Sequence, residues 1–309
     1  MFLKQRLSQT FAVVSIWTVI SLSATGLNAA SSAPQDASSW LIQNPVEGLS
    51  LSGPLVQGGL LLGRIDPASG LLANGKVVFV DQSGKFVIGF GRDQKESFQL
   101  TIETDGTSKH VTLPIQQRTY DIQRIEGVEK KYVEPDPEQV KRSRRDTRQV
   151  VAARKTSSDD SRFMKGFDWP SIGPISGVFG SQRVYNGKPR RPHYGVDIAR
   201  EIGAPVVAPA AGVVTLAEDL YFSGWTLIID HGHYLSSTFL HLDKIHVEIG
   251  DKVEQGELIA DIGNTGRVTG PHLDWRMNWT GGGTNARIDP QLLVPPMPER
   301  LPQQATGSQ

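Results

Sequence analysis

Two short clusters of histidine and aspartate have the residue types and the spacing of a metal site. His193 and Asp197 are four residues apart, with a glycine between them that allows the chain to turn. His272 and Asp274 are two residues apart, so in an extended strand their side chains project from the same face. Imidazole nitrogens and carboxylate oxygens both bind zinc, at about 2.0–2.2 Å. The sequence therefore predicts a metal site with His193, Asp197 and Asp274 as ligands.

The same part of the chain supplies imidazoles that are free to act as bases. A catalytic zinc typically keeps three protein ligands and a water whose pKa falls to about 7. A neutral imidazole beside that water can accept its proton. We therefore expect His241 and His272 to be non-ligand bases or oxyanion donors. His231 is expected to stabilise a turn at a strand end, and His233 and His246 are expected at the surface.

The composition restricts the chemistry further. The chain has 309 residues, a length that suits about two domains, and its hydrophobic content of 38 % is that of a globular protein. It has no cysteine, which excludes disulfides, thiolate metal sites and cysteine nucleophiles. The 32 basic residues balance the 32 acidic ones, so no net field attracts nucleic acid or a membrane surface. Any metal must be held by histidine and carboxylates, and no nucleic-acid partner is expected.

The first thirty residues, 1–30, have the pattern of a secretory signal peptide. Lys4 and Arg6 precede an apolar run over 11–22, and small residues follow near Ala30. The apolar run is short for a membrane-spanning helix, and no later run approaches spanning length. An uncleaved N-terminal anchor is the alternative. We expect an exported protein of the periplasm or cell envelope, with no stable membrane span in its mature form.

The remaining sequence predicts a mainly β protein. Residues 40–128 contain six or seven short runs of strand-forming residues, which suggests a small β-sandwich. Two type I′ hairpin signals lie among them, at Asn74-Gly75 and Asp105-Gly106. Residues 163–294 are rich in glycine and β-branched residues and predict a second domain built of strands. Residues 295–309, with four prolines, are expected to form a disordered tail.

A basic helix is predicted between the two β domains, over residues 136–156. Asp136 can cap it and Pro137 suits its first position. Its many arginines and lysines suggest a solvated linker between domains, or a face for anionic cell-wall polymer or lipid headgroups.

Residues 170–290 resemble the lysostaphin/LytM-type zinc metallopeptidases, metallopeptidase family twenty-three, which hydrolyse bacterial peptidoglycan. The resemblance covers roughly 40 % of the chain and rests on an ordered series of motifs. The matching stretches are residues 178–180, 193–197, 204–212, 230–232, 240–242, 250–256 and 266–272.

This resemblance implies a compact antiparallel sheet of the duplicated-hybrid-motif type, with the metal in a groove. It implies that His193 and Asp197 are zinc ligands and that His241 and His272 are the two catalytic histidines. His272 would be the general base, while His241 would steady the developing oxyanion or orient the water.

One position departs from the family pattern. The third ligand of the family is usually a histidine two residues after the position of His272, where this chain has Asp274. Two carboxylates and one imidazole cancel the charge of Zn²⁺, which weakens it as a Lewis acid and raises the pKa of its water. Such a site could prefer a harder ion such as Mn²⁺, or stand empty. Residues 271–276 resemble a branch of the family with aspartate here, which favours a working site.

The sequence thus predicts an exported metallo-endopeptidase that hydrolyses peptide cross-links of peptidoglycan through a metal-activated water and a histidine base. The alternative is a catalytically degenerate domain that binds and regulates a cell-wall hydrolase, which would then be its partner. A passive wall-binding module is a third hypothesis. Retention of His193, Asp197, His241 and His272, together with the absence of coiled-coil heptads, favours the enzyme.

Overall fold

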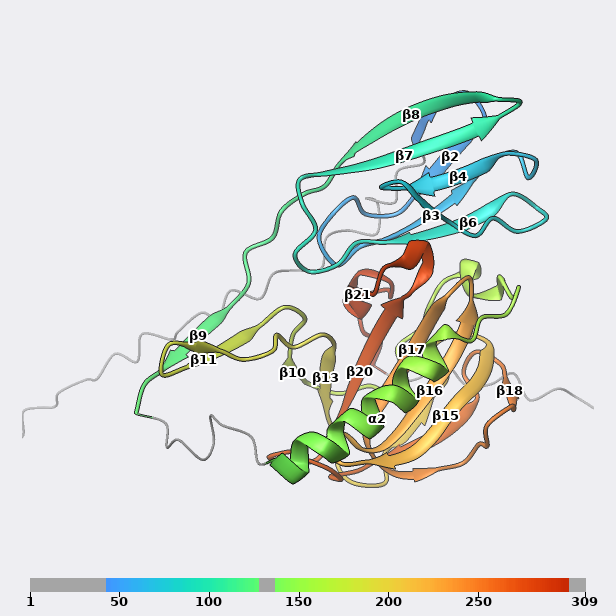
Figure 1. Ribbon diagram of the computed structural model, residues 1–309. Coiled ribbons are helices and arrows are strands. Elements are labelled where there is room, and N and C mark those ends of the chain that lie inside the picture. The colour runs from blue at the N-terminus through green and yellow to red at the C-terminus, as the bar shows by residue number, and fades with distance from the viewer. Residues whose placement is uncertain (1–42, 128–136, 300–309) are drawn as a thin grey trace, which may run out of the picture. The chain divides into compact units, whose positions relative to one another are not determined.

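The computed structural model describes residues 43–127 and 137–299 (Figure 1). The predicted signal peptide and residues 300–309 of the predicted tail lie outside these ranges. Strands dominate the described residues, which contain a single α-helix, so the predicted mainly β fold class is confirmed. Within the described ranges, no helix is both long enough and apolar enough to cross a membrane.

Two four-stranded antiparallel sheets make up the N-terminal part, with strand orders β1-β2-β3-β6 and β5-β4-β7-β8. Their bounds are β1 Gln43–Val46, β2 Leu49–Ser52, β3 Leu60–Arg64, β4 Gly70–Ala73, β5 Lys76–Val77, β6 Lys85–Gly89, β7 Ser97–Thr104 and β8 Thr107–Pro114. Both predicted hairpins form. Asn74 and Gly75 have φ angles of 47° and 78°, and Asp105 and Gly106 have φ angles of 50° and 74°. Positive φ at both central residues is the requirement of a type I′ turn.

A ten-stranded sheet forms the C-terminal part, and all its strand pairs are antiparallel. Its path is β10-β13-β20-β17-β16-β15-β18, with β14 paired to β19, β19 to β17 and β21 to β20. The bounds are β10 Ile175–Gly177, β13 Val196–Ala199, β14 Pro205–Val207, β15 Gly212–Leu220, β16 Gly224–Gly232, β17 Leu235–Ile245, β18 Lys252–Val253, β19 Leu258–Ile262, β20 His272–Trp279 and β21 Ala286–Ile288.

A small third sheet joins the two parts of the chain. Strand β9 (Ile122–Ile125), which follows the N-terminal sheets, pairs in parallel with β11 (Gln182–Tyr185), and β11 pairs with β12 (Lys188–Pro189). Figure 1 shows β9 and β11 side by side. Three short 3-10 helices complete the described elements: η2 Arg162–Lys165, η3 Gly281–Gly283 and η4 Pro290–Leu292.

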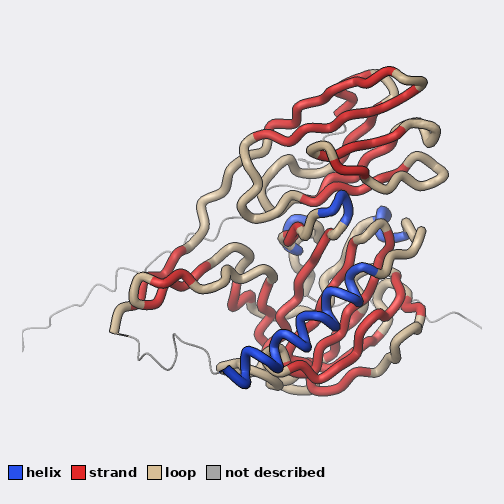
Figure 2. The backbone as a smooth tube through the Cα atoms, in the orientation of Figure 1, coloured by secondary structure: helices blue, strands red, loops and turns tan. Residues whose placement is uncertain are grey.

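Helix α2 (Pro137–Lys155) lies against the large sheet, in front of β15 and β16 (Figures 1 and 2). A helix is predicted at this position, but the sequence suggested a solvated linker. Instead, Ala153 and Val150 pack against buried residues of β15 and β16, among them Leu216 and Ile228. The helix thus covers one face of the sheet, and Arg154 in its last turn is buried.

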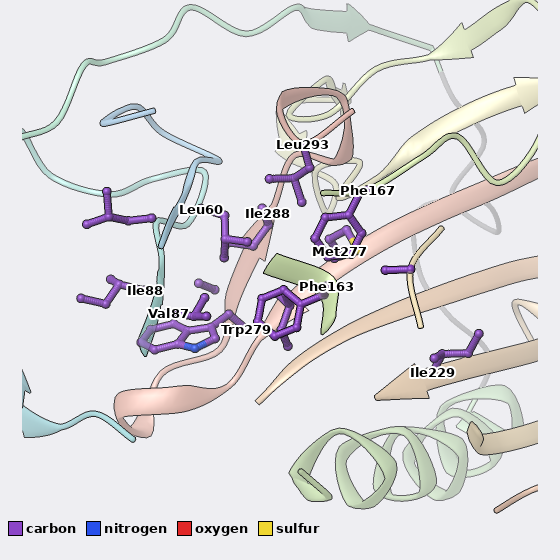
Figure 3. Packing of buried hydrophobic residues seen from close by; sticks show 14 of the residues in the cluster. Leu60, Val87, Ile88, Phe163, Phe167, Ile229, Met277, Trp279, Ile288 and Leu293 are labelled. Atoms are coloured by element: carbon purple, nitrogen blue, oxygen red, sulfur yellow. The ribbon is translucent and has the colours of Figure 1, made fainter. Parts of the chain in front are cut away.

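Strands β20 and β21 also pack against the N-terminal sheets. Figure 3 shows Trp279 and Ile288 among residues such as Val87 of β6. A Cβ atom on Gly89 would come within 2.6 Å of Ile288 Cδ1 and 2.9 Å of Trp279 Cβ, so only glycine permits this close approach.

Polar contacts and the end of the chain complete this packing. Arg118, beyond β8, donates to the buried carboxylate of Asp289 over 2.8 Å. The first residues of the predicted tail lie against the domain as well, because the indole Nε1 of Trp169 donates to the carbonyl of Pro295 over 2.8 Å. Met297 also packs against the hydrophobic core, so the disorder expected from Pro295 onward does not hold for residues 295–299.

Candidate metal centre and catalytic site

Neighbouring elements bring the three predicted ligands together. Asp197 on β13 and Asp274 on β20 are direct cross-strand partners, so their carboxylates share one face of the sheet. His193 lies in the loop that leads into β13. One ligand atom from each of the three residues lies within 4.8 Å of the other two. The fold therefore gathers, from positions far apart in the sequence, a nitrogen and two oxygens of the kind that zinc binds.

Two of the three ligand atoms lack the hydrogen bonds that buried polar atoms usually make. His193 Nε2 lies 3.0 Å from Asp197 Oδ1 and 3.5 Å from Asp274 Oδ1. Nevertheless, both His193 Nε2 and Asp197 Oδ1 are buried and have no hydrogen-bond partner of suitable geometry. Orphaned buried polar atoms are rare because desolvation is costly without compensation. The lone pairs of these two atoms point toward each other with no hydrogen-bond donor between them, which is an arrangement that suits a bound cation.

The other ring nitrogen of His193 fixes its orientation. Nδ1 lies 3.2 Å from the carbonyl oxygen of Val178 and donates its hydrogen to it, which leaves the lone pair on Nε2. Metal-binding histidines almost always make a bond of this kind. Burial would lower the pKa of His193, but without a cation the carboxylates of Asp197 and Asp274 raise it to about 10. A metal would therefore compete with a proton for Nε2.

Two glycines leave room for the carboxylates. A Cβ atom on Gly177 would lie 2.1 Å from Asp197 Oδ2, and one on Gly195 would lie 2.6 Å from Asp274 Oδ1. The Gly195 position would also meet the side chain of Arg276, 2.6 Å away at Cγ. The glycine inside the His193–Asp197 motif is thus required by close packing over β20.

The predicted catalytic histidines lie beside the ligand cluster. The rings of His241 and His272 have centroids 4.9 Å apart, and His272 Nε2 is 3.9 Å from Asp197 Oδ1. Each ring donates Nδ1–H to a backbone carbonyl, His241 to Thr265 and His272 to Gly270, both over 2.9 Å. Each therefore carries a lone pair on Nε2 when it is neutral. Burial lowers the pKa of His241, which favours its neutral form.

Arg276 was missed by the sequence interpretation. Its Nε donates to both oxygens of Asp274, over 2.9 and 3.0 Å, and its terminal nitrogen also bonds Oδ2. Burial would raise the pKa of Asp274, but Arg276 and His193 hold it well below its usual range. Arg276 also offsets the extra negative charge that aspartate brings in place of a neutral histidine. The signal was available, because residues two apart on a strand share a face.

The remaining histidines lie away from this cluster. His231 is fully buried in the core, where its ring bonds the carbonyl of Ala211 and the hydroxyl of Ser237. The expectation that His233 is at the surface is wrong: it is 2 % exposed and packs edge-on against Phe79 of the N-terminal part. Its hairpin lies at the contact between the N-terminal and C-terminal parts, which local sequence does not reveal. His246 is partly exposed and pairs with a carboxylate.

A groove of about 660 Å³ opens in front of the cluster. Its lining includes His193, Asp197 and Arg276 from the C-terminal part, and Asp121 and Gln123 from the segment around β9. Residues that precede helix α2 in the sequence thus supply part of the lining of this groove.

Comparison with known proteins identifies the class of domain. Residues 191–290 match the model of peptidase family M23. The chain thus contains an M23 peptidase domain, homologous to the lysostaphin and LytM-type endopeptidases, and the resemblance inferred from the sequence motifs is confirmed.

Two curated relatives illustrate the range of the match. Over 113 residues the chain is 41 % identical to peptidoglycan DD-endopeptidase ShyA of Vibrio cholerae, covering 36 % of this chain and 26 % of ShyA. Over 104 residues it is 31 % identical to glycyl-glycine endopeptidase ALE-1 of Staphylococcus capitis, covering 33 % of this chain and 29 % of ALE-1. The chain thus spans less than a third of the length of either relative.

A solved structure matches more of the chain. A Pseudomonas aeruginosa chain assigned to peptidase M23 superposes with a TM-score of 0.58 and 28 % sequence identity. The match covers 77 % of this chain and 93 % of the other. The likeness therefore extends beyond the M23 domain into the N-terminal part.

Proposed function

We propose that this protein is an exported metallo-endopeptidase that hydrolyses peptide cross-links in bacterial peptidoglycan. The observation that carries the proposal is the convergence of unpartnered donor atoms from His193 and Asp197, together with Asp274, next to two histidines with free lone pairs. The M23 match and the names of the relatives support peptide hydrolysis and peptidoglycan as the substrate. The pattern of residues 1–30 and the cell-wall substrate of the relatives support export to the periplasm or envelope.

In this proposal His193, Asp197 and Asp274 hold the metal ion. The ion would be Zn²⁺, or Mn²⁺ if the second carboxylate favours a harder cation. When bound, it supplies Lewis acidity, lowering the pKa of a water and polarising the scissile carbonyl. Arg276 keeps Asp274 ionised and oriented, because it bonds both carboxylate oxygens. Oδ1, the oxygen nearer His193 Nε2, accepts only one of these bonds and retains a lone pair for a ligand bond.

The two other histidines handle protons and water. His272 is the general base, since its Nε2 carries a lone pair and lies 3.9 Å from a ligand oxygen of Asp197. Once protonated at Nε2, the same ring can donate to the departing amine. His241 also has its Nδ1 hydrogen committed to a carbonyl, so in its neutral form Nε2 is an acceptor. This favours a role in orienting the attacking water over donation to an oxyanion.

The first test combines metal content with digestion of isolated sacculi. We expect about one Zn²⁺ or Mn²⁺ per chain of purified full-length protein, and newly cleaved peptide cross-links that His272→Ala abolishes. His246→Ala is the matched control, because this histidine pairs with Asp261 outside the cluster, and it should digest normally. A protein that binds no metal and releases no peptide, even with added zinc, would contradict the proposal.

One observation favours a second function. Arg276 bonds both oxygens of Asp274, and a proton on His193 Nε2 would lie between it and the carboxylates. These contacts could satisfy the ligand atoms without a metal. The domain would then bind and regulate a cell-wall hydrolase. Absence of bound metal combined with faster sacculus digestion by an added amidase or other hydrolase would favour this role over the enzyme.

A further inference from the structure

A row of polar side chains continues along β20 beyond the metal ligands. His272, Asp274, Arg276 and Asn278 alternate with buried apolar residues, so all four project from one face of the strand. Asn278 is the cross-strand partner of Arg287 on β21 and bonds its guanidinium. The site face of the sheet therefore extends from the catalytic histidine, through the ligand carboxylate, to two arginines.

A third arginine lies beneath them. Arg154 of α2 is 8 % exposed, and its terminal nitrogen donates to Thr238 Oγ1 over 3.0 Å. Thr238 is the cross-strand partner of Arg276, and Asn278 also bonds its hydroxyl, over 3.3 Å. Arg154, Thr238, Asn278 and Arg287 thus form one hydrogen-bonded chain that ends beside Arg276. We call Arg154, Arg276 and Arg287 the arginine cluster.

The arginine cluster lacks compensating charge. Among the described residues, Asp274 is the single carboxylate bonded to it, and that bond is to Arg276. Arg154 and Arg287 make no salt bridge there, and Arg154 Nε is buried without a hydrogen-bond partner. Burial lowers the pKa of Arg154 and of Arg287, and nearby guanidiniums lower it further, those of Arg287 and Arg276 for Arg154 and that of Arg276 for Arg287. Buried unpaired cations are destabilising, so the cluster fits an anion supplied from outside.

The cluster is open to the groove at one side. Arg276 lines the groove, and its side chain is 26 % exposed. Arg287 is half-buried and lies against the ring of Tyr194, with its guanidinium 5.6 Å from the ring centre. Tyr194 follows the ligand His193 directly, so Arg287 lies beside the loop that carries this ligand. Arg154 lies beneath the other two arginines, so it would contribute positive potential to the groove without touching a ligand bound there.

We propose that Arg276 and Arg287, backed by Arg154, form a subsite for a free carboxylate of the peptide substrate. The inference rests on the proposed peptidase function and adds a requirement for substrate charge. Residues two apart on a strand are separated by about 6.6 Å, which is also about two residues of an extended peptide. A substrate whose scissile amide lies at the metal site would therefore reach Arg276 with a residue about two positions along its chain. The carboxylate that the subsite binds is expected on that residue. Guanidinium groups bind carboxylates in a bidentate manner that a neutral amide cannot match.

The test uses two synthetic cross-linked peptides that differ at one position. The carboxyl group beside the scissile amide is free in one and a carboxamide in the other. We expect the metal-loaded full-length protein to cleave the free-carboxylate peptide with a KM about tenfold lower. Arg287→Gln should raise that KM to the level of the carboxamide peptide and leave kcat on both within about twofold. Arg64→Gln, an exposed arginine of β3, is the matched control and should keep the preference.

Two results would overturn the subsite. One is equal KM values for the two peptides with the wild-type protein, and the other is an Arg287→Gln variant that loses activity on both equally. Arg287→Lys distinguishes charge from folding, since it keeps the cation and should retain part of the preference.

Failure of the proposed function looks different, because neither peptide nor sacculi would then be cleaved. In that case calorimetric binding of the two peptides still tests the subsite. About tenfold tighter binding of the free carboxylate, lost in Arg287→Gln, supports it, and equal binding overturns it.

Discussion

The two faces of strand β20 have opposite characters. On one face Leu273, Trp275, Met277 and Trp279 are at most 1 % exposed and fill the hydrophobic core. On the other, His272, Asp274, Arg276 and Asn278 form the metal cluster and the row of polar groups beyond it. The core face contacts both the large sheet and the N-terminal sheets, and its few polar contacts, such as Trp275 Nε1 to Ser237, are satisfied.

The core face of β20 therefore keeps the strand in place, and the opposite face carries the functional side chains. Packing on the core face fixes the backbone, and a backbone fixed on one side can support unpartnered polar atoms on the other. We therefore expect substitutions on the core face to change stability with little effect on the chemistry of the folded protein. Substitutions on the site face should do the reverse.

Asp274→Ala should give the largest effect, on the site face. It removes one of three ligands and leaves Arg276 without its carboxylate, so we expect loss of bound metal and a fall of at least about a thousandfold in sacculus digestion. Metal analysis and product chromatography measure both effects. Retention of full activity would show that Asp274 is not a ligand.

Trp279→Ala tests the core face of the same strand. Removal of a buried tryptophan typically costs about 3–5 kcal/mol, and this indole packs against the N-terminal sheets. Urea unfolding measures the loss of free energy, while metal content per folded chain should stay at the wild-type level. A variant of normal stability that loses its metal would break the distinction between the faces.

His231 predicts a pH dependence for the core side of the sheet. Burial lowers its pKa to about 4, against about 6.5 in the unfolded chain, so between these values the unfolded state binds more protons. The contribution to stability is complete above pH 6.5 and is lost as the pH falls to about 4, a change of about 3 kcal/mol. Urea unfolding across this range should show a smaller pH slope for His231→Gln than for the wild type. Identical slopes would contradict the assignment.

Gly177→Ala sharpens the comparison with a single methyl group. The new Cβ would overlap Asp197 Oδ2, so the ligand carboxylate must move, and we expect about a hundredfold loss of activity. Thermal unfolding should change little, because Gly177 lies near the end of a short strand. Gly91→Ala controls for the alanine itself, because a Cβ there meets nothing within 4 Å and its φ is not left-handed. Unchanged peptide release by Gly177→Ala would mean that Asp197 has room to adjust.

Asp274→His should have the smallest effect and tests the departure from the family pattern. If Asp274 weakens the metal site relative to the histidine usual in the family, replacing it with histidine would strengthen metal binding. Here the substitution leaves Arg276 uncompensated beside the metal, so we expect affinity to fall about tenfold, and to recover in the double variant with Arg276→Gln. Metal titration of the three proteins decides the matter. Tighter binding by Asp274→His alone would show that aspartate weakens the site.

The sequence predicts the class of fold and the five residues that gather at the site, because spacing within a strand and an ordered motif series are local signals. It does not predict Arg154 or Arg287 as part of the same face. Their positions depend on how α2 packs on the sheet and how β21 pairs with β20, which are long-range contacts. The burial of His233 was missed for the same reason. A basic, polar helix indicates a solvated face, and only the docked structure shows which of its arginines is covered.

Gly89 and Asp289 have a consequence for the order in which the chain can assemble. The ion pair from Arg118 to Asp289 joins residues 171 positions apart, and Gly89 meets Ile288 and Trp279 near the end of the described chain. During synthesis the N-terminal sheets emerge from the ribosome before β20 and β21. Until those strands emerge, the apolar surface around Gly89 that Trp279 and Ile288 cover stays exposed to water. A gene fragment that ends before residue 286 would therefore yield a protein prone to self-association. Any attempt to produce the N-terminal part alone must replace that apolar surface with polar residues.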